Sequence, residues 1–208
     1  GRSYGRGVLG PKKTGFIVLR RNTISHYGTT GTITGNRLLT EWNHIHDAFY
    51  GGDSAGHQMS TMTARTAMTR FGWVRNTPVN GVRTDGDPAG EYHIIHHMLA
   101  YNNNRGFRLK GNHHHIYHLM GFGNFGVDLS VPSYKHPEGN ADSIIKNNAT
   151  AKREISNLNK FNSNNYSSKK KEVLRSHLRD PNRLDFRPAR DSVLIDNGTV
   201  ISEISIPH

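Results

Sequence analysis

The chain has 208 residues, a formal net charge of +11 at neutral pH and 34% hydrophobic residues. Its mean hydropathy is −0.68, and no segment is long and apolar enough to cross a membrane as a helix. The absence of cysteine excludes disulfides and thiolate metal sites. The basic balance favours a polyanionic partner.

Five glycines recur at intervals of 25, 25, 25 and 20 residues, and each opens a short segment of alternating character. They are Gly31, Gly56, Gly81, Gly106 and Gly126. A repeat of this length is typical of a solenoid, in which one supersecondary unit stacks on the next. Equivalent positions of successive repeats should therefore lie side by side.

A second motif recurs out of phase with the glycines, at Asn22, Asn43, Gly72, His97, His118 and Asn148. An apolar residue follows two places later in all but the last copy, which places it on the same face of a strand. Residues 15–150 contain no stretch with helical periodicity. We therefore expect an all-β fold, a parallel β-helix of about six coils. The side chains at 22, 43, 97, 118 and 148 are predicted to stack as an inward polar ladder, the alternative being that they merely mark turns.

The composition changes after residue 150. A segment rich in Asn and Ser precedes a lysine run and residues 172–178, which could form a short helix or a loop over one face of the coil. A strand pair at Ser192–Ile195 and Thr199–Ile204 is expected to complete the stack. The predicted organisation is one domain, with coils over 1–150, an irregular segment with a short helix over 151–191, and terminal strands over 192–208.

Residues 15–150, together with the segment from Arg187 to Thr199, resemble the right-handed β-helix repeat proteins of the pectate-lyase-like superfamily. That group contains polysaccharide lyases and glycoside hydrolases, most of them secreted. The resemblance implies a right-handed single-stranded β-helix, an extracellular location and an acidic polysaccharide as partner. It covers roughly three-quarters of the chain and is specific for fold rather than for substrate.

The start of the chain at Gly1 shows neither an apolar signal segment nor a helix that would cap a solenoid. We therefore expect the C-terminal part of a longer protein, whose N-terminal remainder would cover the first coil. An uncovered first coil would expose a strand edge and favour self-association.

Alternation from the glycines predicts two polar ladders on the outer face of one sheet. The first contains Gln58, Arg83, Arg108 and Asp128, and the second contains Ser60, Asp85, Lys110 and Ser130. The inner face would receive His57, Met59, Val82, Thr84, Phe107, Leu109, Val127 and Leu129. Stacked arginines repel each other unless an anion lies near them, so the array predicts a site for a sugar-acid chain. The alternative is a structural ladder with the ion pairs Asp85–Lys110 and Arg108–Asp128.

The lyase chemistry that the resemblance implies needs a base and a cation that neutralises the uronate carboxylate. Lys110 suits the base, and Arg108 and Arg83 suit the carboxylate clamp. Further substrate contacts are predicted from Gln58, Asp128, His113, His115, Tyr134 and Lys135. Calcium is the candidate cofactor, with Asp53, Asp85 and Asp87 as oxygen ligands, and no organic cofactor is expected.

Two other functions remain open. A hydrolase of the polygalacturonase type would use two of the carboxyl groups of Asp53, Asp85, Asp87 and Asp128, although the paired-aspartate motif of that family is absent. A non-catalytic polysaccharide-binding or structural β-helix is the third class. Nucleic acid is disfavoured, because basic residues of the repeats alternate with Asp and no nucleic-acid motif is present. The histidines between His93 and His118 suggest a transition-metal site less than substrate contacts, because alternation sends neighbours to opposite faces.

Overall fold

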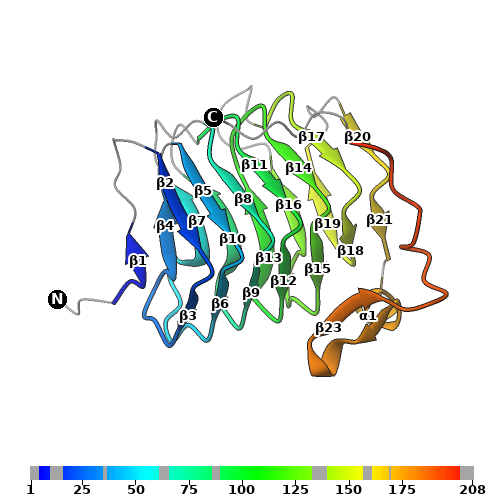
Figure 1. Ribbon diagram of the computed structural model, residues 1–208, viewed down its shortest axis with the longest axis horizontal. Helices are drawn as coiled ribbons and strands as arrows, with labels where there is room; N and C mark the ends of the chain where they lie inside the picture. Colours follow the sequence, from blue (N-terminus) through cyan, green and yellow to red (C-terminus); the bar gives the residue numbers. More distant parts are fainter. Residues whose placement is uncertain are drawn as a thin grey trace.

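The computed structural model describes residues 5–9, 16–34, 37–60, 66–85, 90–132, 140–156, 161–168 and 170–201. These residues form a parallel β-solenoid of three long sheets with one short α-helix near its C-terminal end (Figure 1). The predicted all-β parallel β-helix is confirmed. The number of coils differs slightly from the expected six, since each sheet contains seven strands. No helix within the described residues could span a membrane.

Each coil contributes one strand to each of three parallel sheets, named here A, B and C. Sheet A contains β1 (Val8–Leu9), β4 (Thr32–Thr34), β7 (Ala55–Ser60), β10 (Asn80–Asp85), β13 (Arg105–Leu109), β16 (Leu129–Val131) and β19 (Arg153–Ile155). Sheet B contains β2 (Ile17–Arg20), β5 (Leu38–Glu41), β8 (Met68–Arg70), β11 (Ile94–His96), β14 (His115–Tyr117), β17 (Ile144–Lys146) and β20 (Phe161–Ser163). Sheet C contains β3 (Thr23–Ser25), β6 (His44–His46), β9 (Trp73–Arg75), β12 (Leu99–Tyr101), β15 (Met120–Phe122), β18 (Ala149–Thr150) and β21 (Tyr166–Ser167).

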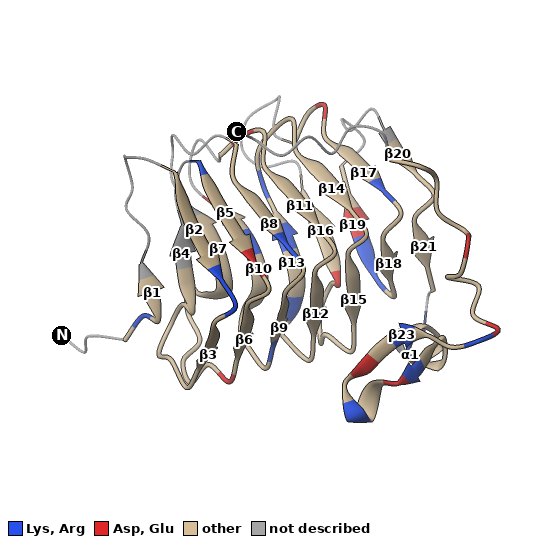
Figure 2. Cartoon of the chain, viewed as in Figure 1, with Lys and Arg blue, Asp and Glu red and all other residues tan. Residues whose placement is uncertain are grey.

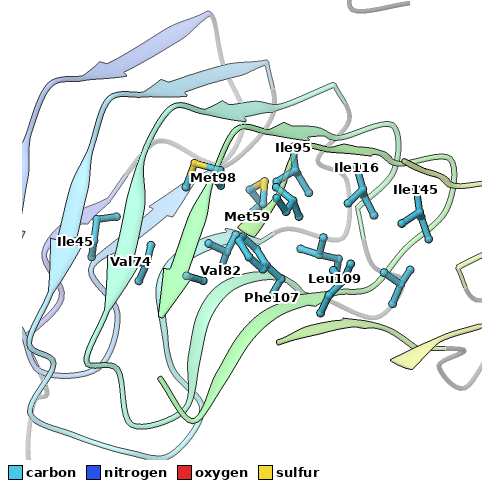
Figure 3. Packing of buried hydrophobic residues seen from close by; sticks show 14 of the residues in the cluster. Ile45, Met59, Val74, Val82, Ile95, Met98, Phe107, Leu109, Ile116 and Ile145 are labelled. Carbon is cyan, nitrogen blue, oxygen red and sulfur yellow. The ribbon is translucent and has the colours of Figure 1, made fainter. Parts of the chain in front are cut away.

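The core is a thin apolar column between the three sheets. Figure 3 shows Val82 and Phe107 from sheet A, Ile95 and Ile116 from sheet B, and Val74 from sheet C pointing into it. Because each strand is short, it supplies only one or two buried apolar side chains, and continuity arises from stacking identical positions. This explains how a chain with 34% hydrophobic residues builds a closed core.

The inward positions predicted for Met59, Val82, Phe107, Leu109 and Leu129 are confirmed, and so is that of the polar residue His57. His57 is completely buried. Its Nδ1 lies 2.5 Å from Thr32 Oγ1 and its Nε2 lies 2.9 Å from Thr69 Oγ1. Burial lowers the pKa of His57 to about 4, so the ring is neutral at physiological pH.

Asparagine side chains form a ladder at the corner before sheet C. The backbone N–H of Asn22 donates to Asn43 Oδ1 at 3.0 Å, and that of Leu119 donates to Asn148 Oδ1 at 2.8 Å. Asn148 N–H donates in turn to Asn165 Oδ1 at 2.9 Å. The ladder predicted at positions 22, 43 and 148 is therefore confirmed, and Asn165 is a member that the sequence analysis missed.

The prediction that His97 and His118 belong to this ladder is wrong. Pairing of Leu99 with Trp73 and with Met120 places Met98 and Leu119 at the ladder positions. His97 and His118 lie one residue earlier, each with φ of 50°. They occupy the left-handed corner column that also contains Trp42 and Phe71, and they stack on each other at 4.5 Å.

The other two corners carry ladders that the sequence analysis did not predict. At the corner between sheets C and A, Thr77 N–H donates to Asn103 Oδ1 at 3.0 Å and Asn103 N–H donates to Asn124 Oδ1 at 2.9 Å. At the corner between sheets A and B, the acceptors are imidazoles: Ala67 N–H donates to His93 Nδ1, and His93 N–H donates to His114 Nδ1, both at 3.2 Å. Each corner thus satisfies its turn N–H groups through the side chain of the next coil.

The C-terminal segment packs on sheet C. The coil continues beyond residue 150 through β19, β20 and β21, and is followed by α1 (Lys171–Ser176), β22 (Leu178–Asp180), a short 3₁₀ turn (Pro181–Arg183) and β23 (Asp185–Pro188). Leu174 and Leu178 are buried against Leu99 and Phe122, as the predicted short helix over one face requires. Residues 192–201 contain turns and no strand, so the strand predicted at 192–195 is wrong, and residues 202–208 lie outside the described part.

Candidate functional site

Charged residues are spread along the length of the solenoid and over the C-terminal hairpin rather than gathered at one end (Figure 2). On the outer face of sheet A they fall in register, as predicted. Arg83 on β10 pairs with Gln58 on β7 and with Arg108 on β13. The parallel sheet therefore holds two arginines on adjacent strands.

The last step of the first predicted ladder is wrong, because Arg108 pairs with Ser130 rather than with Asp128. Ser130 in turn pairs with Glu154 on β19. Phe107 correspondingly pairs with Leu129, two residues beyond the partner that Gly126 would give it. Because of the same shift, the prediction that Ser130 lies beside Lys110 is also wrong.

The carboxylate of Asp128 is engaged in hydrogen bonds within the turn at which the register shifts. Its carboxylate accepts hydrogen bonds from Asn124 Nδ2 at 2.7 Å, from the backbone N–H of Ala151 at 3.0 Å and from that of Lys152 at 2.9 Å. The residue is completely buried. Asp128 therefore closes a turn, and the structure does not place it where a polymer on the outer face of sheet A could reach it.

Asp53, Arg83, Asp85, Lys110 and Arg108 make up what we call the sheet A network. Arg83 Nη1 donates to Asp53 Oδ1 at 2.5 Å, and Arg83 Nη2 donates to Asp85. Lys110 Nζ donates to Asp85 Oδ1 at 2.6 Å. The Asp85–Lys110 pair of the structural alternative is thus present, while the Arg108–Asp128 pair is not.

The sheet A network differs from a set of surface ion pairs because two of its cations are buried. The side chains of Arg83 and Lys110 are 2% and 6% exposed, whereas that of Asp53 is 86% exposed. The hydrogen bond from Arg83 lowers the pKa of Asp53, with further lowering by the charges of Lys110 and Arg108. Arg83 and Lys110 are paired directly with the carboxylates of Asp53 and Asp85. Within the described residues, Arg83 Nε is buried without a hydrogen-bond partner.

The predicted calcium ligands do not fit a metal in this arrangement. Asp53 and Asp85 are both bound to Arg83, and Asp85 is also bound to Lys110. Asp87 lies outside the described residues. In the described ranges, no three His, Asp or Glu side chains are placed to share a metal ion. Carboxylates already neutralised by two buried cations are poor ligands for a hard divalent cation.

The remaining predicted contacts are dispersed. His113 lies at the corner between sheets A and B, where it stacks on Tyr92 with ring centroids 4.7 Å apart. His115 belongs to β14 of sheet B and pairs with Ile94 and Ile144, so it is on a different sheet from the network. Tyr134 and Lys135 lie outside the described residues.

A second ion network on sheet B was missed by the sequence analysis. Glu41, which is buried, accepts hydrogen bonds from Arg20 Nε at 2.5 Å and from Arg70 Nε at 2.7 Å. Burial alone would raise the pKa of Glu41, but the hydrogen bonds from Arg70 and Arg20 lower it. Its signal in the sequence was the charged last residue of three short apolar segments, which the structure aligns on β2, β5 and β8. A glutamate held between two arginines has a structural role.

No protein-family model, curated protein or solved structure matches the chain. The functional argument therefore rests on the fold and on the side chains that it brings together.

Proposed function

We propose that the protein binds a uronate-containing polysaccharide along the outer face of sheet A and cleaves it by β-elimination. The observation that supports this is the adjacency of Arg83 and Arg108 on neighbouring strands, with Lys110 directly after the end of β13. The parallel sheet places these two arginines on adjacent strands about 4.8 Å apart, which concentrates positive charge where an extended anionic chain would lie. The proposal carries the expectation that the protein meets its polymer outside the cell.

The two arginines have different roles in this proposal. Arg108 is half-buried, and in the proposed complex its guanidinium binds the substrate carboxylate through paired N–H donors. Arg83 is buried and bound to Asp53 and Asp85. It fixes the position of Asp85, which in turn holds Lys110. Gln58, on the other side of Arg83, extends the polar face by one coil.

The elimination step uses Lys110 and Asp85 together. Lys110 acts as the base in its neutral amine form. Lys110 therefore passes its proton to solvent, and the carboxylate of Asp85, whose Oδ1 lies 2.6 Å from Nζ, holds the amine in position. The free amine then removes the proton α to the carboxylate, the electron pair forms the new carbon–carbon double bond, and the glycosidic oxygen leaves and takes a proton from water. Arg108 stabilises the negative charge that develops on the carboxylate.

A hydrolytic reaction has less support. A glycosidase needs one carboxyl group that stays protonated near neutral pH, which requires a raised pKa. The hydrogen bond from Arg83 instead lowers the pKa of Asp53. A non-catalytic binding protein would use Arg108 in the same way and leave the Lys110–Asp85 pair intact.

The experiment that tests the proposal is ultraviolet absorbance of the unsaturated product during incubation with polygalacturonate, alginate and hyaluronan. The wild type is compared with Lys110→Arg, which keeps the charge but cannot act as the base, and with Arg108→Gln. Arg105→Gln is the matched control, because Arg105 is an exposed arginine at the other end of β13. We expect the wild type to form unsaturated product from one of the polymers and Lys110→Arg to form none. Arg108→Gln should form product at least about tenfold more slowly than the wild type, and Arg105→Gln at the wild-type rate.

Each other outcome assigns a different function. Undiminished product from Lys110→Arg would remove Lys110 from the chemistry. New reducing ends without absorbance would indicate hydrolysis. Saturable binding that Arg108→Gln weakens, with neither product, would leave a polysaccharide-binding protein.

A further inference from the structure

A cavity of about 320 Å³ lies on another side of the solenoid, at the corner between sheets B and C. Its walls come from the C-terminal end of the corner column, from the first residues of β15, β18 and β21, and from the segment after β23. In Figure 1 that segment leaves β23 and runs outside β21. The described residues that line the cavity include no Lys, Arg, Asp or Glu, although the whole chain carries a net charge of +11.

The outer wall of the cavity is fixed by specific hydrogen bonds. Asn147 Nδ2 donates to the carbonyl of Thr199 at 2.7 Å, and Thr199 N–H donates to Asn147 Oδ1 at 2.9 Å. Leu194 packs in the same apolar cluster as Met120 and Tyr166. The segment is thus bound both through a paired amide and through apolar contact, so the cavity is a built feature of the fold.

Two polar side chains that take no part in the corner ladders face this space. His118 stacks on His97, and neither nitrogen of His118 has a hydrogen-bond partner within the described ranges. The same holds for the side-chain amide of Asn164, which is exposed at the rim. Burial lowers the pKa of His118 and lowers that of His97 to about 4, where the charge of His118 contributes as well. Both rings are therefore neutral near pH 7.

The lining has an apolar floor and an uncharged polar rim. Leu119, Met120, Ala149 and Leu194 supply the floor. A neutral imidazole and a carboxamide each offer donors and acceptors together, which hydroxyl groups match in either direction. The volume is at the lower end of the range of about 300–1,000 Å³ that is usual for small-molecule sites. A ligand carboxylate would find no cationic partner among the described lining residues.

We propose that this cavity binds one neutral sugar residue, as a site separate from the anionic-polymer surface on sheet A. The C–H face of the sugar ring packs on the floor, and its hydroxyls bond to His118 and to Asn164. The site does not depend on the function proposed for sheet A, since it shares no residue with the sheet A network.

The test is ligand-observed saturation-transfer NMR with the methyl glycosides of glucose, galactose and mannose, N-acetylglucosamine and, as the charged probe, galacturonate. Two variants remove the polar groups: His118→Phe keeps the ring stack, and Asn164→Gly keeps the left-handed corner, where φ is 50°. Asn102→Gly is the matched control, because Asn102 is an exposed corner residue with φ of 55° outside the cavity. Ala149→Leu, which fills the floor, is a further variant at a half-buried position.

We expect saturable binding of at least one neutral glycoside, weakened about tenfold by His118→Phe and by Asn164→Gly, abolished by Ala149→Leu and unchanged by Asn102→Gly. Arg108→Gln should also leave it unchanged, which separates this site from sheet A. Absence of saturable binding by any neutral probe to the wild type would overturn the proposal. So would galacturonate binding of equal affinity with the same sensitivity to His118→Phe.

Discussion

Two corners of the solenoid satisfy their turn N–H groups with different side chains. One lies between sheets A and B, and the other lies between sheets C and A. In one, Ala67 N–H donates to an imidazole nitrogen of His93; in the other, Thr77 N–H donates to the amide oxygen of Asn103. In both, a turn N–H of one coil is satisfied by the side chain of the next. An imidazole can therefore replace a carboxamide in a solenoid ladder only while it stays neutral, because protonation turns the acceptor nitrogen into a donor.

The largest predicted effect is acid destabilisation through the histidine ladder. His114 Nε2–H donates to the carbonyl of Lys110 at 2.7 Å, which leaves Nδ1 as the acceptor for His93 N–H. Burial lowers the pKa of His114 to about 4, and burial with the charges of His114 and His57 lowers that of His93. The unfolded rings take up protons near pH 6.5, so stability is full above that pH and falls as the pH drops toward 4. His114 alone contributes about 3 kcal/mol to this loss.

The measurement is the free energy of unfolding in urea, by circular dichroism, between pH 7.5 and pH 4. His114→Asn should make the slope shallower over that range, although it lowers stability at neutral pH. A wild-type curve that is flat from pH 6.5 to pH 4 would contradict the neutral-ladder account.

The sheet A network should respond to substitution strongly but without this pH dependence. Asp85→Ala leaves the buried cations Arg83 and Lys110 without their shared carboxylate, at a cost of about 3 kcal/mol. A second substitution, Lys110→Met, should recover part of that loss. Unfolding of the single and double variants in urea gives the coupling, and strictly additive losses would mean that the two side chains do not interact.

A smaller loss is expected at the asparagine ladder. Asn103→Ala removes the acceptor of the Thr77 N–H at 3.0 Å and of the Thr77 hydroxyl at 2.9 Å, leaving buried donors unsatisfied. The expected cost is about 2 kcal/mol, with the same pH slope as the wild type. A loss below about 0.5 kcal/mol, as at an ordinary surface position, would show that water or a turn rearrangement replaces the ladder.

The sequence predicts the fold and much of the register because repeats align on their glycines. Gly31, Gly56, Gly81 and Gly106 occupy equivalent positions at or next to the start of successive strands of sheet A, and their close contacts leave no room for a β-carbon. Gly126 does not continue the series, since its N–H donates to the carbonyl of Asn104 in the preceding coil. Asp128 takes the position equivalent to Gly106 instead. A glycine spacing does not reveal which of two neighbouring residues the turn uses.

The ladders and the site show a second limit. His97 and His118 resemble ladder residues because histidine also suits the left-handed corner one position earlier, and only strand pairing separates the two positions. Asp53 reaches Arg83 from a connecting segment rather than from a paired strand. Strand periodicity therefore does not predict the contact between Asp53 and Arg83. It does predict the register of Gln58, Arg83 and Arg108.

The proposed role of Arg108 is recognition of an acidic polysaccharide on the outer face of sheet A. Its most direct test is isothermal titration calorimetry with an oligogalacturonate at low ionic strength, comparing the wild type, Arg108→Gln and Arg105→Gln. The account predicts saturable binding that Arg108→Gln weakens about tenfold or more and that Arg105→Gln leaves within error of the wild type. Equal weakening by both variants would indicate non-specific attraction to a basic protein and would contradict the account.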